Sequence, residues 1–228
     1  MEDDVEPDDR VMKITDSELR RRLRDGEEIP EWFAHPKVVD ELRSSYPQRS
    51  KQGLTVLMTG LPSSGKSELA KAVMAKLLEH GGRPVTLLDS AELRKTLSDE
   101  LTFTKEHREK SLKRISHVAR EVTRNGGIAL CAAIAPFEES RRTMRAEVEE
   151  TGAFIEVYVS TPLEACEQRD TKGLYKSAHA GQTASFTGVS DPYEEPKNAH
   201  LQVDMSEQMV DMAAQSVVST LQEMGLVN

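Results

Sequence analysis

The residues with the clearest chemical potential are Gly60-Leu-Pro-Ser-Ser-Gly-Lys-Ser67, which match the pattern G-x-x-x-x-G-K-[ST]. Glycines let the backbone wrap a phosphate group, and successive N–H groups at the start of a helix then face the anion. In this pattern the lysine reaches the β- and γ-phosphates and the hydroxyl after it ligates Mg²⁺. We therefore expect a purine nucleoside triphosphate such as ATP, with Mg²⁺, bound by Gly60, Ser63, Ser64, Gly65, Lys66 and Ser67.

The elements around this loop must form a scaffold that positions it. A short apolar run at 54–59 precedes the loop, and a helical pattern at 67–80 follows it. Further apolar runs and helical patterns then alternate, at 84–89, 106–125, 128–134, 138–151 and 154–159. Strands that alternate with helices form right-handed crossovers and a mainly parallel sheet. The sequence predicts an α/β fold with three α/β/α layers, a polar stretch at about 170–200 and a last helix at about 205–224.

The N-terminal fifty residues follow a different pattern. Thr15 and Glu18 form a capping-box sequence, which predicts a helix that Gly26 ends. A second short helix is expected at about 36–44. We expect three parts in the chain: an acidic, disordered tail at 1–13, a helical extension at 14–50, and a phosphate-loop domain at 51–228.

Composition limits the function classes. The chain of 228 residues has 30% charged and 37% hydrophobic residues, which suits a soluble globular protein. It has no apolar run of about 18 residues, so we expect no transmembrane helix. Cys131 and Cys166 make no disulfide framework, and a cytoplasmic location is expected. The net charge of −9 argues against a nucleic-acid partner, although six of the acidic residues lie in residues 1–12.

The phosphate loop alone fits both a nucleotide-hydrolysing switch and a small-molecule kinase. The guanine-reading sequence N-K-x-D is absent. Motor-type ATPases usually have a larger core with a strand that ends in Asp-Glu, whereas the second predicted strand ends at Asp89. A short chain with a late, basic, glycine-punctuated segment is typical of a nucleotide or metabolite kinase with a lid.

Further segments, in order and at family spacing, resemble adenylyl-sulfate kinase (APS kinase) over residues 50–226. They are Leu88-Asp89 with Arg94, Phe103, Arg108, Ala133-Ile134-x-Pro136, Glu156-Val-Tyr-Val159, Pro162-Leu163, Cys166-Glu-x-Arg169-Asp170, Lys172-Gly-Leu-Tyr-Lys176, Phe186-Thr-Gly188 and Pro192-Tyr193-Glu194. Residues 14–46, which include Ile29-Pro-Glu-Trp-Phe33, resemble the C-terminal end of ATP sulfurylase. In fused sulfurylase–kinase proteins that segment directly precedes the kinase.

The resemblance implies a P-loop kinase that phosphorylates the 3′-hydroxyl of adenylyl sulfate (APS) with ATP, which yields 3′-phosphoadenylyl sulfate (PAPS). It implies catalytic roles for Lys66, Asp89 and Lys172, and a magnesium site at Ser67 and Asp89. The implied substrate-binding residues are Arg94, Phe103, Arg108, Ser111, Ile134, Lys172, Phe186 and Thr187, with the two phenylalanines on either side of the adenine. A homodimer, and fusion to or association with ATP sulfurylase, are also implied. The plainer alternatives are core phenylalanines, a solvated basic helix face for Arg108 and a surface lysine at 172.

The chain departs from the family pattern on the acceptor side. The family's Asp-Gly-Asp reads Asp89-Ser90-Ala91 here, so the second carboxylate is missing. The other departures are His107, Ser111, Ala135, Phe137 and His179, where the family has aspartate, asparagine, serine, tyrosine and arginine. Fungal sulfurylases carry a kinase-like regulatory domain whose phosphate loop is altered, whereas the loop of this chain is intact. Two alternatives to an active APS kinase stay open: a weak or silent nucleotide-binding regulatory module of an ATP sulfurylase, and a kinase for a related acceptor.

Overall fold

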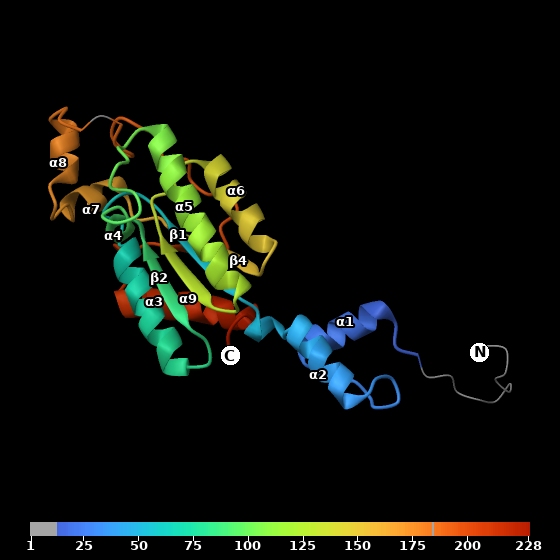
Figure 1. Cartoon of the computed structure of the whole chain (residues 1–228). Helices are drawn as coiled ribbons and strands as arrows, with labels where there is room; N and C mark the ends of the chain where they lie inside the picture. Colours follow the sequence, from blue (N-terminus) through green and yellow to red (C-terminus); the bar gives the residue numbers. More distant parts are fainter. Residues whose placement is uncertain (1–12, 184) are drawn as a thin grey trace. The chain divides into compact units, whose positions relative to one another are not determined.

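The structure is a computed structural model that describes residues 13–183 and 185–228. The chain divides into two compact units, one that extends to Lys51 and one from Gln52 to Asn228 (Figure 1). The acidic tail predicted at 1–13 lies outside the described residues except for Lys13.

The N-terminal unit contains two short helices, α1 (Asp16–Asp25) and α2 (Pro36–Ser45), and a 3₁₀ turn at Arg49–Lys51. The predicted capping box forms, since the Thr15 hydroxyl accepts a hydrogen bond from the backbone N–H of Glu18 at 3.2 Å. Gly26 ends α1 as predicted, with a left-handed φ of 73°. The buried side chains of this unit include Leu23, Ile29 and Val39.

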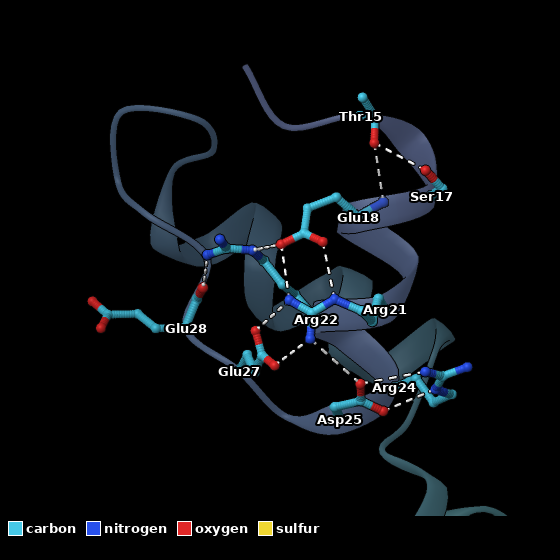
Figure 2. A network of polar contacts seen from close by, with 9 residues as sticks. All are labelled: Thr15, Ser17, Glu18, Arg21, Arg22, Arg24, Asp25, Glu27 and Glu28. Carbon is cyan, nitrogen blue, oxygen red and sulfur yellow. Dashed lines mark hydrogen bonds and ion pairs between the residues drawn. The ribbon is translucent and has the colours of Figure 1, made fainter. Parts of the chain in front are cut away.

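The surface of α1 carries an ion-pair network (Figure 2). The Glu18 carboxylate accepts hydrogen bonds from Arg21 and Arg22, and Arg21 also pairs with Glu27. These hydrogen bonds hold the pKa of Glu18 at about 2. The network is exposed, so it contributes little to stability.

The second unit is built on a parallel sheet. In the described part of the chain the sheet has five strands in the order β2-β3-β1-β4-β5, and every neighbouring pair is parallel. The strands are β1 (Leu54–Thr59), β2 (Val85–Asp89), β3 (Ile128–Ala132), β4 (Ala153–Val159) and β5 (Leu201–Val203). The first four lie where the apolar runs predict them, and β5 was not predicted because it has only three residues.

Helices cover both faces of this sheet, which confirms the predicted α/β/α layers (Figure 1). On one face α3 (Lys66–His80) and α9 (Val210–Glu223) pack together over the inward side chains of β1, β3 and β4. On the other face, α5 (Lys105–Arg124) and α6 (Glu138–Glu149) bury a second cluster that includes Leu57, Cys131 and Phe154. Both cysteines are free and buried. No helix of residues 13–183 and 185–228 is long and apolar enough to cross a membrane.

Three short helices complete the second unit: α4 (Ser90–Leu93), α7 (Leu163–Gln168) and α8 (Leu174–His179). The prediction of a last helix from about residue 205 was wrong at its start, because α9 begins at Val210. The Asp204 carboxylate accepts hydrogen bonds from the backbone N–H and the hydroxyl of Ser206, which form a local turn after β5 instead of a helix.

All strands are parallel, so their carboxyl ends meet at one edge of the sheet. Thr59, Asp89 and Ala132 are the last residues of β1, β2 and β3. In open α/β sheets this edge is where ligands bind. The phosphate loop follows β1 here, the segment after β3 lies next to it in strand order, and the segment after β2 lies one strand further along.

Candidate functional site

The phosphate loop connects β1 to α3, and its backbone requires glycine. Its φ angles are left-handed at Ser63 (58°) and Gly65 (99°). A Cβ atom at Gly60 would lie 2.4 Å from the carbonyl oxygen of Val159, too close for any side chain. The loop leads into the N-terminus of α3, where free N–H groups and the helix dipole favour an anion. The conformation therefore suits the phosphate binding that the sequence predicts.

Lys66, the first residue of α3, folds back over the loop. It is 8% exposed, and its Nζ donates to the Leu61 carbonyl oxygen at 2.5 Å and to Ser64 Oγ at 3.2 Å. Burial lowers the pKa of Lys66 to about 8, while the neighbouring Cys166 and Asp89 act in the opposite direction. Its hydrogen-bond acceptors are neutral, so the ammonium charge remains available to a phosphate.

Asp89 ends β2 and caps α4. Its Oδ1 accepts a hydrogen bond from the backbone N–H of Ala91 at 2.8 Å, and the residue is 8% exposed. Ser67 directly follows Lys66. Within residues 13–183 and 185–228, no three His, Cys, Asp or Glu side chains gather into a metal site. A hydroxyl and one carboxylate nevertheless suit Mg²⁺, which usually takes few protein ligands and completes its shell with phosphates and water.

A cavity of about 290 Å³ lies at the carboxyl ends of β2 and β3. Its wall contains six of the eight predicted substrate-binding residues: Arg94, Phe103, Arg108, Ser111, Ile134 and Lys172. They come from the end of α4, the segment before α5, α5 itself, the segment after β3 and the segment before α8. The fold therefore brings together residues that are up to about eighty positions apart in the sequence.

Two arginines give the cavity positive charge. The Arg94 guanidinium lies 4.4 Å from the centre of the Phe103 ring and donates to the Leu101 carbonyl oxygen at 2.9 Å. Arg108 Nε donates to the Phe103 carbonyl oxygen at 2.7 Å, and its Nη1 is buried with no hydrogen-bond partner among the described residues. Burial lowers the pKa of both arginines, but a guanidinium remains charged at neutral pH. An unpaired donor of this kind suits an anionic ligand.

Phe186 and Thr187 do not line this cavity. Phe186 is 5% exposed and packs edge-to-face on Tyr175, with ring centres 5.0 Å apart. Thr187 is fully buried, and its Oγ1 has no partner within the described chain. Phe103 is 44% exposed, and the Arg94 guanidinium lies over its ring. In this structure the two phenylalanines thus have different surroundings, and their joint stacking on adenine stays a prediction.

A buried network of hydrogen bonds and an ion pair holds the loop that lines the cavity. Thr59 Oγ1 donates to the Ile134 carbonyl oxygen at 2.6 Å and also hydrogen bonds with the Tyr193 hydroxyl at 2.8 Å. Arg141 is 1% exposed, donates to the Ala135 carbonyl oxygen at 2.8 Å and forms an ion pair with Glu156 at 2.9 Å. Ala135 has a left-handed φ of 43°. These contacts tie the loop after β3, which lines the cavity, to the end of β1.

The departures from the family pattern divide by position. Ala91, Ser111, Ala135 and Phe137 line the cavity. The other two lie elsewhere: His107 accepts a hydrogen bond from the backbone N–H of Thr102 at 2.9 Å, and exposed His179 pairs with Glu167 at 2.8 Å. Most of the changes therefore concern the wall of this cavity.

Sequence reasoning missed several residues on the cavity wall, among them Ser90, Glu109, Ser140 and Leu174. Glu109 lies one position after Arg108 and two before Ser111 on α5, and residues at such spacings do not share a helix face, so helical periodicity does not predict it. Ser140 carries no local signal, since only the packing of α6 brings it to the cavity.

Comparison with known proteins agrees with the geometry. The family model described as adenylylsulphate kinase matches residues 52–204, and the model described as ATP-sulfurylase matches residues 1–45. Sulfate adenylyltransferase of Neurospora crassa is 47% identical over 219 residues, which cover 96% of this chain and 38% of that protein. The corresponding protein of Mycosarcoma maydis is also 47% identical, over 99% of this chain and 40% of its own length. The chain thus spans about two fifths of these relatives.

Two solved structures are similar in both sequence and fold. A hexameric APS kinase from Thiobacillus denitrificans has a TM-score of 0.81 at 37% identity and covers all of this chain and 40% of its own. An APS kinase of Mycobacterium tuberculosis in complex with AMPPNP and APS has a TM-score of 0.72 at 41% identity, over 75% of this chain and 98% of its own.

Proposed function

The chain belongs to the adenylylsulphate kinase family, and from this premise we propose that it transfers the γ-phosphoryl group of ATP to the 3′-hydroxyl of APS. The products are PAPS and ADP. One observation carries the proposal: an intact phosphate loop with a buried lysine shares a sheet edge with a cavity lined by Arg94, Arg108 and Lys172.

On the nucleotide side, the loop from Gly60 to Ser67 would hold the phosphates of ATP with its backbone N–H groups. Lys66 would neutralise charge on the β- and γ-phosphates. Ser67 and Asp89 are the proposed protein ligands of Mg²⁺. That ion would supply charge neutralisation between the β- and γ-phosphates.

On the acceptor side, three cations face a ligand with two anionic groups. Arg94 and Arg108 would bind the phosphosulfate of APS, and Lys172 would add charge from the lid. Phe103 would stack on the adenine, with Phe186 as its proposed partner. Ser111, Ile134 and Thr187 complete the proposed contacts. This assignment is supported by the charges and the shared cavity of six of these eight residues.

The reaction is a displacement at phosphorus. The 3′-oxygen of APS forms a bond to the γ-phosphorus, the bond to the β–γ bridging oxygen breaks, and ADP leaves. The hydroxyl proton passes to Asp89 or to water. Such transfers depend on positioning and charge neutralisation more than on a strong base, so the loss of a carboxylate at Ala91 is compatible with turnover.

A second candidate function rests on Ala91 and on the relatives, which are named for sulfate adenylyltransferase activity. The chain would then be a binding module that recognises APS or PAPS without turnover. The intact loop at Gly65-Lys66-Ser67 favours the enzyme. The same experiment separates the two functions.

The test is an assay of ADP release with ATP, Mg²⁺ and APS, in which PAPS is identified by mass spectrometry. We expect ADP and PAPS in equal amounts. APS binding by calorimetry without any PAPS would favour the binding module, whereas ADP release with another hydroxyl compound but not with APS would indicate a different acceptor.

The organisation of the chain follows the same proposal. Residues 14–50 would be an extension that resembles the end of ATP sulfurylase, and residues 51–228 the kinase domain; the boundary between the compact units at Lys51 supports this division. We propose a homodimer in the cytoplasm, either fused to or associated with ATP sulfurylase. Light scattering coupled to gel filtration tests the dimer.

A further inference from the structure

Helix α8 is hydrogen bonded directly to the phosphate loop. The hydroxyl of Tyr175 donates to the carbonyl oxygen of Pro62 at 2.9 Å, in a contact that is buried. Pro62 lies in the middle of the phosphate loop, and Tyr175 is the second residue of α8. The two residues are more than a hundred positions apart, so this bond exists only in the folded protein.

A second set of contacts fixes the turn that precedes α8. The Asp170 carboxylate accepts hydrogen bonds from the backbone N–H groups of Leu174 and Tyr175 at 2.8 and 2.7 Å, and from that of Lys176 at 3.3 Å. Gly173 adopts a left-handed φ of 66° and donates its N–H to the Asp170 carbonyl oxygen at 3.2 Å. The Asp170 carboxylate therefore holds the turn at 170–174 against the first residues of α8. The Tyr175 hydroxyl in turn holds α8 against the phosphate loop.

This turn contributes two residues to the acceptor cavity, Lys172 and Leu174. Lys172 lies three positions before Tyr175. The Tyr175 hydroxyl thus connects the Pro62 carbonyl group to the turn that carries Lys172. The Tyr175 side chain therefore links the phosphate loop to the turn that lines the acceptor cavity.

The surroundings of Tyr175 leave its ring little freedom. It is 2% exposed and packs against Phe186, within a small cluster that also contains Cys166 and Ala178. A ring that is held this firmly transmits a displacement at its hydroxyl end rather than absorbing it by a change of rotamer.

We propose that Tyr175 is a positioning residue that couples occupancy of the phosphate loop to the placement of Lys172 in the acceptor cavity. The inference rests on the proposed function for the identity of the two ligands. Its thermodynamic content is that a nucleotide in the loop tightens acceptor binding, and, because coupling is reciprocal, that APS tightens nucleotide binding by the same factor.

The test uses Tyr175→Phe in the full chain, which keeps the ring and removes only the hydroxyl donor. Thr55→Val is the matched control, because the Thr55 hydroxyl is also buried and hydrogen bonded, to Thr123 at 2.7 Å, but lies near the opposite end of β1. Calorimetry measures the affinity for APS with and without AMPPNP and Mg²⁺, and thermal unfolding measures the stability of both variants.

In the wild type we expect AMPPNP to tighten APS binding. Tyr175→Phe should reduce that tightening by about 3- to 10-fold, the range expected for one buried hydrogen bond. It should change the affinity for each ligand alone by less than about 2-fold. Thr55→Val should leave unchanged the tightening of APS binding by AMPPNP. This should hold even where Thr55→Val lowers the melting temperature as much as Tyr175→Phe does. Equal tightening in wild type and Tyr175→Phe, or no tightening in the wild type, would overturn the inference.

The inference and the proposed function can fail separately. Coupled binding of AMPPNP and APS without PAPS formation would contradict the proposed kinase activity and support the coupling. If the wild type binds no APS, hydrogen exchange at the amides of residues 174–176 provides the readout. AMPPNP should slow this exchange in the wild type and have a smaller effect in Tyr175→Phe. Equal slowing in both proteins would contradict the coupling.

Discussion

The phosphate loop and the acceptor cavity occupy the same edge of the sheet but are built in different ways. The loop is one continuous segment of eight residues, in which backbone shape and one buried lysine provide the binding groups. The cavity takes its charged and aromatic side chains from several segments between Arg94 and Lys172. A substitution in the continuous loop disturbs the backbone conformation that binds phosphate. A substitution in the cavity wall changes one side chain and leaves the rest of the wall in place. This difference is consistent with an intact loop beside an acceptor site that departs from the family pattern.

The two sides also differ in the exposure of some of their side chains. Lys66 and Asp89 are both 8% exposed, whereas Phe103 is 44% exposed and Lys172 is exposed as well. The nucleotide side therefore has its charged groups in place before any ligand binds. On the acceptor side Arg108 is similarly buried, with 8% of its side chain exposed, whereas the exposed Phe103 and Lys172 must be ordered by the ligand, at a cost in side-chain entropy.

Replacement of the buried lysine tests the nucleotide side and should give the largest effect. In Lys66→Met we expect kcat to fall by at least about 100-fold, because one preorganised charge on the transferred phosphate is lost. Steady-state ADP release measures it. Lys71→Met, an exposed lysine on the same helix, is the control and should retain activity. Similar losses in both variants would mean that Lys66 acts only through the stability of α3.

The corresponding test of the acceptor side is Arg108→Met. Loss of charge-assisted hydrogen bonds should raise the KM for APS by about 10- to 100-fold and leave AMPPNP affinity nearly unchanged. Lys110→Met, which removes an exposed charge from the same helix, should change neither value. If Arg108→Met weakens the binding of APS and of AMPPNP to the same extent, Arg108 does not act on the acceptor side alone.

Restoring the missing carboxylate sharpens the comparison. In Ala91→Asp we expect kcat to rise by about 10-fold, less than the full 10²–10⁴ of general-base catalysis because the transition state is loose. Ala91→Asn has a similar shape without the charge and should give no gain. If Ala91→Asp also gives none, the lost carboxylate does not limit the rate of this protein.

The smallest expected effect is the change in AMPPNP affinity with pH, which tests the nucleotide side. Burial lowers the pKa of Lys66 to about 8, so the charged form prevails below this pH and the neutral form above it. We expect the affinity for AMPPNP to fall by about 3- to 10-fold between about pH 7 and pH 9. The change should be absent from Lys66→Met. Calorimetry at several pH values measures it, and an affinity that rises with pH would contradict the assigned role.

Much of the scaffold could be predicted because its signals are local. The apolar runs give β1 to β4 within a few residues, and Thr15 and Gly26 mark the ends of α1. β5 was missed because three residues carry too little periodicity. The predicted start of α9 was wrong because the turn at Asp204 and Ser206 depends on hydrogen bonds to one carboxylate.

For the site, residue type and spacing identified the phosphate loop and six of the residues that the cavity collects. They did not indicate that Phe186 packs on Tyr175 while Phe103 remains exposed. Both residues are phenylalanines in polar surroundings, so nothing in the sequence distinguishes them.

The sequence by itself determined the phosphate loop, the alternation of strands and helices, and the loss of a carboxylate at Ala91, because each depends on neighbouring residues or on residue identity. Only the tertiary structure decided that Tyr175 reaches Pro62, that Arg141 supports the Ala135 carbonyl group, and that Glu109 and Ser140 enter the cavity wall. These contacts join segments that only the parallel sheet and its helices bring together. Packing geometry, rather than any local preference, selects them.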